Sequence, residues 1–115
     1  MTADRIGRSA EGRAALWLRL KGWQILERRF RTPVGEIDLV ARRGRVVAFV
    51  EVKARPTRDA GLEAVGAKQR RRWRRAADAW LARHPAQQQL TLRFDLIVIV
   101  PWRLPFHLQN VGDIY

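Results

Sequence analysis

The chain has 115 residues, 47% of them hydrophobic, which is enough for one globular domain over residues 1–115 with a single core. Its 23 Lys and Arg against 11 Asp and Glu give a formal net charge of +12. Such a charge attracts polyanions, and nucleic acid, the commonest of them, is the partner we expect. A basic surface that serves solubility or binds a protein is the alternative.

The composition also excludes several kinds of site. There is no Cys, which rules out disulfides, Cys-ligated zinc and thiol catalysis, and which agrees with a reducing cytoplasm. No stretch approaches the ~20 apolar residues needed to cross a bilayer, and residues 1–13 lack the apolar core of a signal peptide. We therefore expect a cytoplasmic protein with no membrane partner.

The first predicted element is a helix from about Asp4 to Lys21, followed by Gly22 as a C-cap glycine. Its apolar stripe is Ala10, Ala14, Trp17 and Leu18. Glu11 lies on or beside this stripe, and a buried carboxylate needs a partner. The alternatives are a metal, a hydrogen-bonded network, or an ion pair with Arg8 or Arg13.

A first strand is predicted over Trp23 to Phe30, with Thr32-Pro33 as the link to the next element. Three arginines crowd its end: Arg28, Arg29 and Arg31. Guanidinium groups bind phosphates well, so these side chains are candidates for nucleic-acid contacts. A solvated charged edge is the alternative.

The next two runs, Val34–Arg42 and Val46–Lys53, are rich in Val, Ile, Leu and Phe and predict a β-hairpin. A two-residue Gly44-Arg45 loop has Gly first, as a type II′ turn prefers, and it pairs Arg43 with Val46. That register places Asp38 opposite Glu51 and Glu36 opposite Lys53. A four-residue loop leaves Asp38 and Glu51 as diagonal neighbours, and a three-residue loop puts them on opposite faces.

Directly opposed like charges destabilise a sheet, so Asp38 against Glu51 needs a reason. A divalent cation between them is one, because hard oxygen ligands on a rigid element suit Mg²⁺ or Mn²⁺. Lys53, on the same face, is placed to hold a phosphate or to help activate a water. The alternative is that Glu51 and Lys53 form an edge-strand charge pair while Asp38 faces solvent.

A loop containing Arg55 is predicted from Ala54 to Gly61, followed by a helix from about Glu63 or Ala67 to Arg83. Gln69 points along the apolar stripe of that helix, where a polar amide needs a partner such as the hairpin site. The rest of its first half is basic, and polyphosphate would relieve the repulsion. With the loop and the first strand, the candidate nucleic-acid contacts are Arg28, Arg29, Arg31, Arg55, Lys68, Arg70, Arg71, Arg72, Arg74 and Arg75.

The last regular element is a strand from Leu90 to Val100, whose apolar end predicts burial on both faces. Asp95 within it is expected to bridge to an Arg or cap the strand entry, and His107 is expected at the surface. A short edge strand around Phe106–Asn110 is possible. Helices before and after an antiparallel meander favour a mixed sheet of four or five strands flanked by helices. The expected core tryptophans are Trp17, Trp23, Trp73 and Trp80.

Five segments in this order resemble the YraN-like family of small bacterial proteins over nearly the whole chain. They are GRSAEGRAALWLRLKGW, GEIDLVAR, VVAFVEVKAR, AKQRRRWRRAADAWL and RFDLIVIV. The family in turn resembles the PD-(D/E)XK nucleases of the restriction-endonuclease-like superfamily, particularly archaeal Holliday-junction resolvases. The resemblance implies a three-layer α/β/α fold, and it allows a homodimer, since resolvase-like relatives work as dimers.

The same resemblance implies roles for five residues. Asp38, Glu51 and Glu11 would be the metal ligands, Lys53 the catalytic lysine, and Gln69 the glutamine that some relatives place on the following helix. Asp38 follows Ile37, where the motif has proline, although many relatives vary there. The expected function is a metal-dependent DNA endonuclease using Mg²⁺ or Mn²⁺, with branched or damaged DNA as candidate substrate.

Two other functions remain open at this point. The first is a nucleic-acid-binding module that keeps the nuclease-like fold without cutting, with salt-dependent and metal-independent binding. The second is a structural, ribosome- or RNA-associated basic protein, which leaves the opposed carboxylates of the hairpin unexplained.

Overall fold

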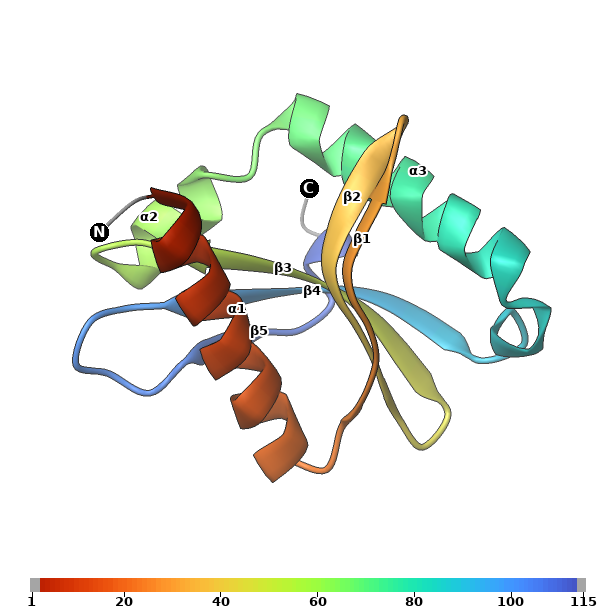
Figure 1. Cartoon of the computed structure of the whole chain (residues 1–115), viewed down its shortest axis with the longest axis horizontal. Coiled ribbons are helices and arrows are strands. Elements are labelled where there is room, and N and C mark those ends of the chain that lie inside the picture. Colours follow the sequence, from red (N-terminus) through yellow and green to blue (C-terminus); the bar gives the residue numbers. More distant parts are fainter. Residues whose placement is uncertain (1–2, 114–115) are drawn as a thin grey trace.

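A computed structural model describes residues 3–113 of the protein, with side chains described over residues 9–112 (Figure 1). Its helices and strands are α1 (Ala3–Leu20), β1 (Gln24–Thr32), β2 (Gly35–Arg43), β3 (Val46–Ala54), α2 (Arg58–Glu63), α3 (Ala67–Arg83), β4 (Thr91–Ile99) and β5 (Phe106–Leu108). Short 3₁₀ turns cover Pro85–Gln87 and Val111–Asp113. Over this described range, none of the helices has the length and apolar character needed to cross a membrane.

The five strands form one mixed sheet in the order β1-β2-β3-β4-β5. The β3–β4 pair is parallel, and the other neighbours are antiparallel. The parallel pair requires the crossover through α2 and α3, because two parallel strands cannot be joined by a tight turn. The predicted mixed sheet with flanking helices, including the short edge strand β5, is therefore confirmed.

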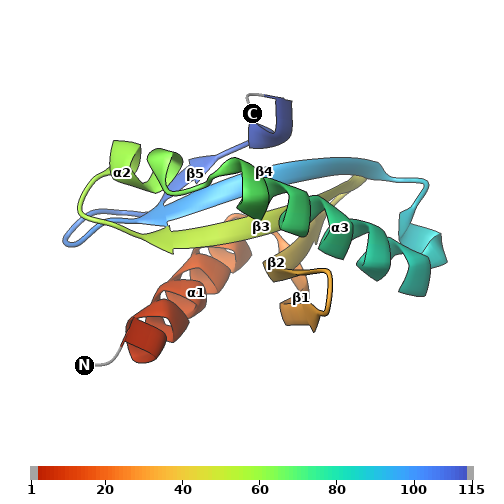
Figure 2. The same ribbon diagram turned by 90° about the horizontal axis from the view of Figure 1, so that it is seen from above.

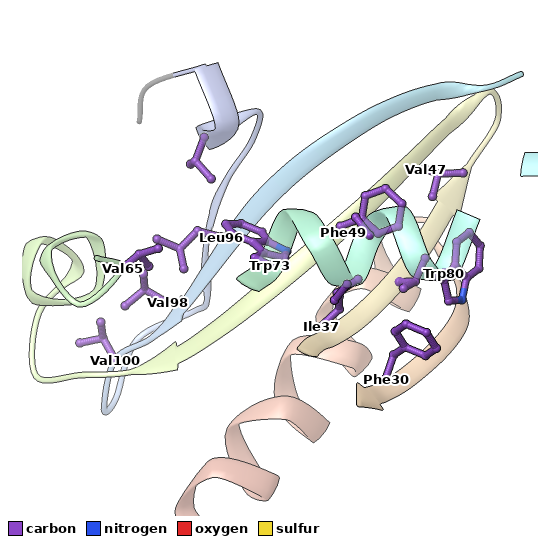
Figure 3. Close-up of a cluster of buried hydrophobic side chains, with 14 residues drawn as sticks. Phe30, Ile37, Val47, Phe49, Val65, Trp73, Trp80, Leu96, Val98 and Val100 are labelled. Carbon is purple, nitrogen blue, oxygen red and sulfur yellow. The ribbon is translucent and has the colours of Figure 1, made fainter. Parts of the chain in front are cut away.

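Two apolar clusters lie on opposite faces of this sheet and make the fold three-layered. In Figure 2, α1 lies below the strands and α3 crosses in front of them. On one face Ala14 and Leu18 of α1 pack with Leu39 and Val50. On the other face α3 packs its aromatic side chains, in a cluster drawn in Figure 3 whose largest members include Phe49, Trp73 and Trp80. This agrees with the predicted α/β/α layering.

Three of the four expected core tryptophans are buried: Trp23, Trp73 and Trp80. Trp17 is only half-buried, and Lys21 lies 4.6 Å above its ring. The expectation of a core role is wrong for Trp17, because its position at the edge of the α1 stripe leaves one face of the ring to a cation.

The predicted loop over Ala54–Gly61 is wrong in its second half, where α2 begins at Arg58. Thr57 caps this helix by accepting a hydrogen bond of 3.1 Å from the Ala60 amide. Gly61 is buried directly against the side chain of Val98, where a Cβ would lie 2.5 Å from a methyl carbon. The helix depends on this tertiary contact, which sequence periodicity over so short a segment cannot reveal.

The β2–β3 hairpin turns through the two-residue Gly44-Arg45 loop, and Gly44 has the expected positive φ of 59°. The ladder runs in the predicted register from Arg43↔Val46 to Leu39↔Val50. Beyond Leu39 no further pair is formed, because β2 bends away from β3. The predicted pairing of Asp38 with Glu51 is therefore wrong, although both side chains reach the same hollow. Ile37 accordingly packs on the α3 face, whereas simple alternation placed it with Leu39 on the other.

The start of β2 comes into close contact with α3 at Gly35. A Cβ at that position would lie 1.9 Å from the backbone carbonyl oxygen of Arg72, so any side chain there would force the two elements apart. This contact fixes the distance between α3 and the bent end of β2. It thereby positions the side chains described next.

Candidate active site

A hollow of about 360 Å³ opens where β2 leaves β3. Its lining includes five polar side chains from four elements: Glu11 of α1, Asp38 of β2, Glu51 and Lys53 of β3, and Gln69 of α3. They are the five residues that the sequence and the family resemblance assigned to catalysis. The fold brings them together, while their chemical roles stay a prediction.

Asp38 is buried, with 8% of its surface exposed. Its Oδ2 accepts a hydrogen bond of 2.8 Å from the Val52 backbone amide. This bond takes the place of a ladder bond at the point where the two strands diverge. Burial raises the pKa of Asp38, and the Val52 amide, Arg31 and Lys53 only partly offset that effect.

Glu51 is the most perturbed acid of the site. It is 5% exposed, and its burial, together with the nearby charge of Asp38, raises its pKa to about 8. Lys53 Nζ lies 3.1 Å from Oε1, and Gln69 Nε2 donates a hydrogen bond of 2.6 Å to the same oxygen. Among the described residues, no group is bonded to Oε2, which leaves that oxygen for another partner.

Glu11 reaches the same hollow from α1, with 12% of its side chain exposed. Burial, the charge of Asp38 and a hydrogen bond with the Asp38 carboxyl raise its pKa, against the pull of Arg29 and Arg31. Its cationic partner is Arg29, with Nε 3.5 Å from Oε2. Arg29 has a positive φ of 54°, and a strained conformation of this kind is concentrated at functional sites.

Among the described side chains, Glu11 pairs with Arg29 and not with Arg13. The side chain of Arg8 lies outside the described residues, and Arg13 lines a neighbouring hollow. The sequence did name Arg29 as a phosphate ligand, but it gave no signal that β1 would cross beside Glu11. That crossing depends on the strand order.

The predicted pairing of Glu36 with Lys53 is wrong, because β2 has already left β3 at Glu36. Glu36 instead lies 3.3 Å from Arg31 and 3.9 Å from Arg72. The alternative prediction was a surface pair of Glu51 with Lys53 and an Asp38 that faces solvent. The Glu51–Lys53 contact is present, but the rest of that alternative is wrong. β3 is an inner strand, and Asp38 is buried.

Half of the basic residues predicted to bind nucleic acid lie close to the acidic hollow. Arg55 lines it, and Arg29 and Arg31 pair with acids at its edge. Lys68 and Arg72 line an adjoining hollow of about 380 Å³ that shares Glu36 and Gln69 with the first. These five side chains surround the acids with positive charge.

The other predicted contacts point elsewhere. Arg70 donates to the Val65 carbonyl and Arg74 to the Gly112 carbonyl, each at 3.1 Å, while Arg28 lies beside α1. Arg71 and Arg75 are exposed on the outer face of α3. The cations of α3 are thus spread around the helix, because consecutive residues point in different directions.

His107, expected at the surface, is instead part of a buried polar network. Its side chain is 9% exposed, and Nε2 lies 2.7 Å from Asp95 Oδ2. Arg93 holds the same carboxylate through two hydrogen bonds of 2.8 and 2.9 Å, which confirms the expected Asp95–Arg bridge. The sequence spacing gave no sign of the His107 contact, because it is formed only when β5 pairs with β4.

The acidic hollow holds oxygen ligands of the kind that Mg²⁺ and Mn²⁺ prefer. In the described part of the chain, no three Asp, Glu or His side chains are gathered so that they could hold a metal by themselves. Mg²⁺ is commonly held by one or two carboxylates, with waters and substrate phosphates completing its shell. Asp38 and Glu51 meet that smaller requirement, and a cation between them would relieve the repulsion that raises the pKa of Glu51.

The family model that matches residues 10–99 is described as uncharacterised protein family UPF0102. The UPF0102 protein of Chelativorans sp. (strain BNC1) is 53% identical over 95% of this chain and 88% of the relative. The UPF0102 protein of Methylorubrum extorquens (strain PA1) is 56% identical over 94% of this chain and 84% of the relative. A third UPF0102 protein, from Paramagnetospirillum magneticum (strain ATCC 700264 / AMB-1), is 52% identical over 97% of this chain and 90% of the relative. These matches confirm the resemblance to a family of uncharacterised bacterial proteins, and its further likeness to nucleases stays a prediction.

Proposed function

We propose that this chain, which belongs to the uncharacterised protein family UPF0102, is a cytoplasmic, metal-dependent nuclease that hydrolyses phosphodiester bonds in DNA. The observation that supports this proposal is the meeting of two buried carboxylates and a lysine in one hollow, at Asp38, Glu51 and Lys53. The net charge of +12 suits a polyanionic substrate. Branched or damaged DNA is the candidate substrate.

Asp38 and Glu51 would hold a divalent metal, together with the Val52 carbonyl, and Glu11 would support Asp38 through the hydrogen bond between their carboxyl groups. Such a metal supplies a bound water of lowered pKa and stabilises charge on the phosphate. Glu51 can offer Oε2 to it, because Lys53 and Gln69 both contact Oε1. The Val52 amide holds Asp38 in place, so this carboxylate needs little reorganisation to accept a ligand.

Lys53 and Gln69 have positioning and charge-compensating roles in this proposal. The ammonium of Lys53 lies at the edge of the hollow, where it can contact a scissile phosphate or a water. Gln69 fixes the orientation of Glu51, because the Nε2 group of the Gln69 side chain donates a hydrogen bond to the Glu51 carboxylate. Arg29, Arg31 and Arg55 lie around the opening and bind the neighbouring phosphates.

One observation favours a second candidate, a nucleic-acid-binding module that does not cut. Glu51 is already held by a cation and an amide, and no group of three acids is gathered among the described residues. In that case the Glu51–Lys53 pair serves stability alone. Binding would then depend strongly on salt and be indifferent to metal.

Cleavage of a panel of linear, nicked, flapped and four-way DNA with Mg²⁺ or Mn²⁺ tests the two candidates. We expect metal-dependent cleavage that Asp38→Asn and Lys53→Ala each reduce by about a hundredfold or more, on the scale of losing one essential charged group. Asp59→Asn and Lys21→Ala are the matched controls, because both residues are exposed and lie outside the hollow. Full activity in Asp38→Asn or Lys53→Ala contradicts the roles assigned here, and salt-dependent binding without cleavage favours the module.

A further inference from the structure

The acidic hollow continues into two further hollows along the surface. The first, of about 410 Å³, shares Ala10, Ala54 and Arg55 with it. The second, of about 610 Å³, shares Arg13 and Pro101 with the first and ends at Trp102 and Leu104. The loops after β3 and β4 project from the same end of the sheet (Figures 1 and 2). Residues of these two loops line the two hollows.

The chemistry of this extension is cationic and apolar. Three guanidinium groups line it, at Arg13, Arg55 and Arg103, and among the residues whose side chains the structure describes, no acid lines either hollow. Arg13 and Arg103 form no side-chain hydrogen bond or ion pair with any residue that the structure describes. The walls between these cations are apolar, with Ile99 and Pro56 among them. Charges that bind phosphates beside surfaces that accept bases are the two features a nucleic-acid strand requires.

Trp102, at the far end of the extension, is unusual in its exposure and in its backbone conformation. It is fully exposed, although indole is the largest of the apolar side chains. The Arg103 amide donates to the Val100 carbonyl at 3.3 Å, which closes a turn with Pro101 and Trp102 as the central residues. Trp102 has a φ of 63° there, at a turn position that favours Gly. A bulky aromatic residue rarely adopts this conformation, and such backbone outliers are concentrated at active sites and ligand clamps.

We propose that a single-stranded segment of DNA lies along this extension, with an unpaired base stacked on Trp102 and its phosphates beside Arg13, Arg55 and Arg103. Bases within a duplex already stack on one another, so a free indole face selects unpaired bases. The inference rests on the proposed nuclease function for the role of the acidic hollow. It narrows the substrate to DNA in which an unpaired strand leads to the bond that is cut.

Binding of labelled oligothymidylate in EDTA tests this inference without any cleavage. We expect the wild type to bind this probe more tightly than blunt duplex of the same length, with quenching of tryptophan fluorescence. Trp102→Gly should weaken binding by about 5- to 150-fold, the range for losing one base–aromatic stack. Gly suits the turn position, so the loss will not come from misfolding, and Trp102→Phe should restore most of the affinity. Leu20→Ala, at an exposed apolar residue outside the hollows, is the control and should bind like the wild type.

Three results would overturn the inference. The first is unchanged oligothymidylate affinity in Trp102→Gly, and the second is equal affinity for duplex. The third is a wild-type homodimer that Trp102→Gly converts to monomer without a change in binding per chain, which would make Trp102 a subunit contact. Trp102-dependent binding in a protein that cuts no DNA would reject the nuclease proposal alone. Cleavage that survives together with unchanged binding in Trp102→Gly would reject only the single-strand site.

Discussion

Gln69 Nε2 donates a hydrogen bond of 2.6 Å to Glu51 Oε1 and thereby joins the first turn of α3 to the middle of β3. Glu51 is buried, so this bond and the contact with Lys53 fix a carboxylate that would otherwise lie unpartnered in an apolar sheet. The close approach of Gly35 to the backbone of Arg72 holds α3 at the distance that the bond requires. The candidate site is therefore built by packing between helix and sheet as much as by the hairpin.

Replacing Gln69 with Leu should raise the pKa of Glu51 further, because the ionised carboxylate loses a hydrogen bond while its burial is kept. A hydrogen bond to a charged group is worth about 1.5–3 kcal/mol, so the acid limb of the pH–rate profile should move up by roughly one to two pH units. Gln89→Leu, at an exposed position, is the control. An unchanged midpoint in Gln69→Leu would show that Glu51 does not need to be ionised for activity.

Glu51→Gln should change how stability depends on pH. In the wild type the folded protein keeps the Glu51 proton up to about pH 8, whereas the unfolded chain loses it near the ordinary pKa of 4.5. Between these values the unfolded chain binds fewer protons, so the free energy of unfolding falls as pH rises, by up to about 1.4 kcal/mol per pH unit from this group. Asp38 and Glu11, whose pKa values are also raised, act in the same direction.

The amide of Glu51→Gln cannot ionise, so part of this slope should disappear. Urea unfolding at about pH 5 and about pH 8 measures the pH dependence of the free energy of unfolding. Relative to the wild type, the variant should be more stable at about pH 8 than at about pH 5. Glu63→Gln, at an exposed residue, should follow the wild type. A variant that loses stability equally at both pH values would show that Glu51 is ionised in the folded protein throughout this range.

Binding of Mn²⁺ near neutral pH should release protons, because a carboxylate must be ionised to bind a metal while burial keeps Glu51 largely protonated. Calorimetry in two buffers of different ionisation enthalpy measures the number of protons released. We expect release in the wild type and in Asp59→Asn, and weak or absent binding in Asp38→Asn. Tight Mn²⁺ binding that Asp38→Asn does not weaken would show that the metal binds outside this hollow.

Gly35→Ala should both destabilise the protein and disturb the site. Its Cβ would lie 1.9 Å from the Arg72 carbonyl oxygen, and relieving that overlap must displace β2 or α3, at a cost of about 1–3 kcal/mol typical of overpacking. Gly12→Ala is the matched control, because it adds the same methyl group at a helical position with room for it. It should stabilise the protein by about 0.5–1 kcal/mol. Equal unfolding midpoints for the two variants would contradict the close contact.

The site residues could be predicted from sequence largely because side chains alternate along a strand. Once Gly44 closes a two-residue turn, the register follows as far as Leu39↔Val50, and alternation places Glu51 and Lys53 on one side of β3. Asp38 was assigned to that side by the same alternation, although the ladder ends before it. The stripes of α1 and α3 placed Glu11 and Gln69 at the edge of the core in the same way. These are local regularities, and in β2 the alternation holds only as far as the ladder with β3, since Ile37 packs on the α3 face.

Sequence reasoning failed where a contact depends on elements far apart in the chain. The Glu36–Lys53 pair does not form because β2 bends away from β3 at Asp38. No residue type in the hairpin sequence predicts that bend. His107 is buried against Asp95 only because β5 adds to the edge of β4. A pattern of polar and apolar residues within one element does not predict contacts between elements that are far apart in the sequence.

What the sequence determined by itself is the basic charge, the order of helices and strands, and the set of acids and the lysine that share one side of a hairpin. Only the tertiary structure decided that Glu51 becomes buried enough to hold its proton to about pH 8, and that Arg29 of β1 pairs with Glu11 of α1. It also decided that Trp102 stands exposed at the end of a cationic surface. The physical reason is that burial and the electric field at a side chain are summed over every element packed around it, whereas the periodicity of a sequence reports on one element at a time.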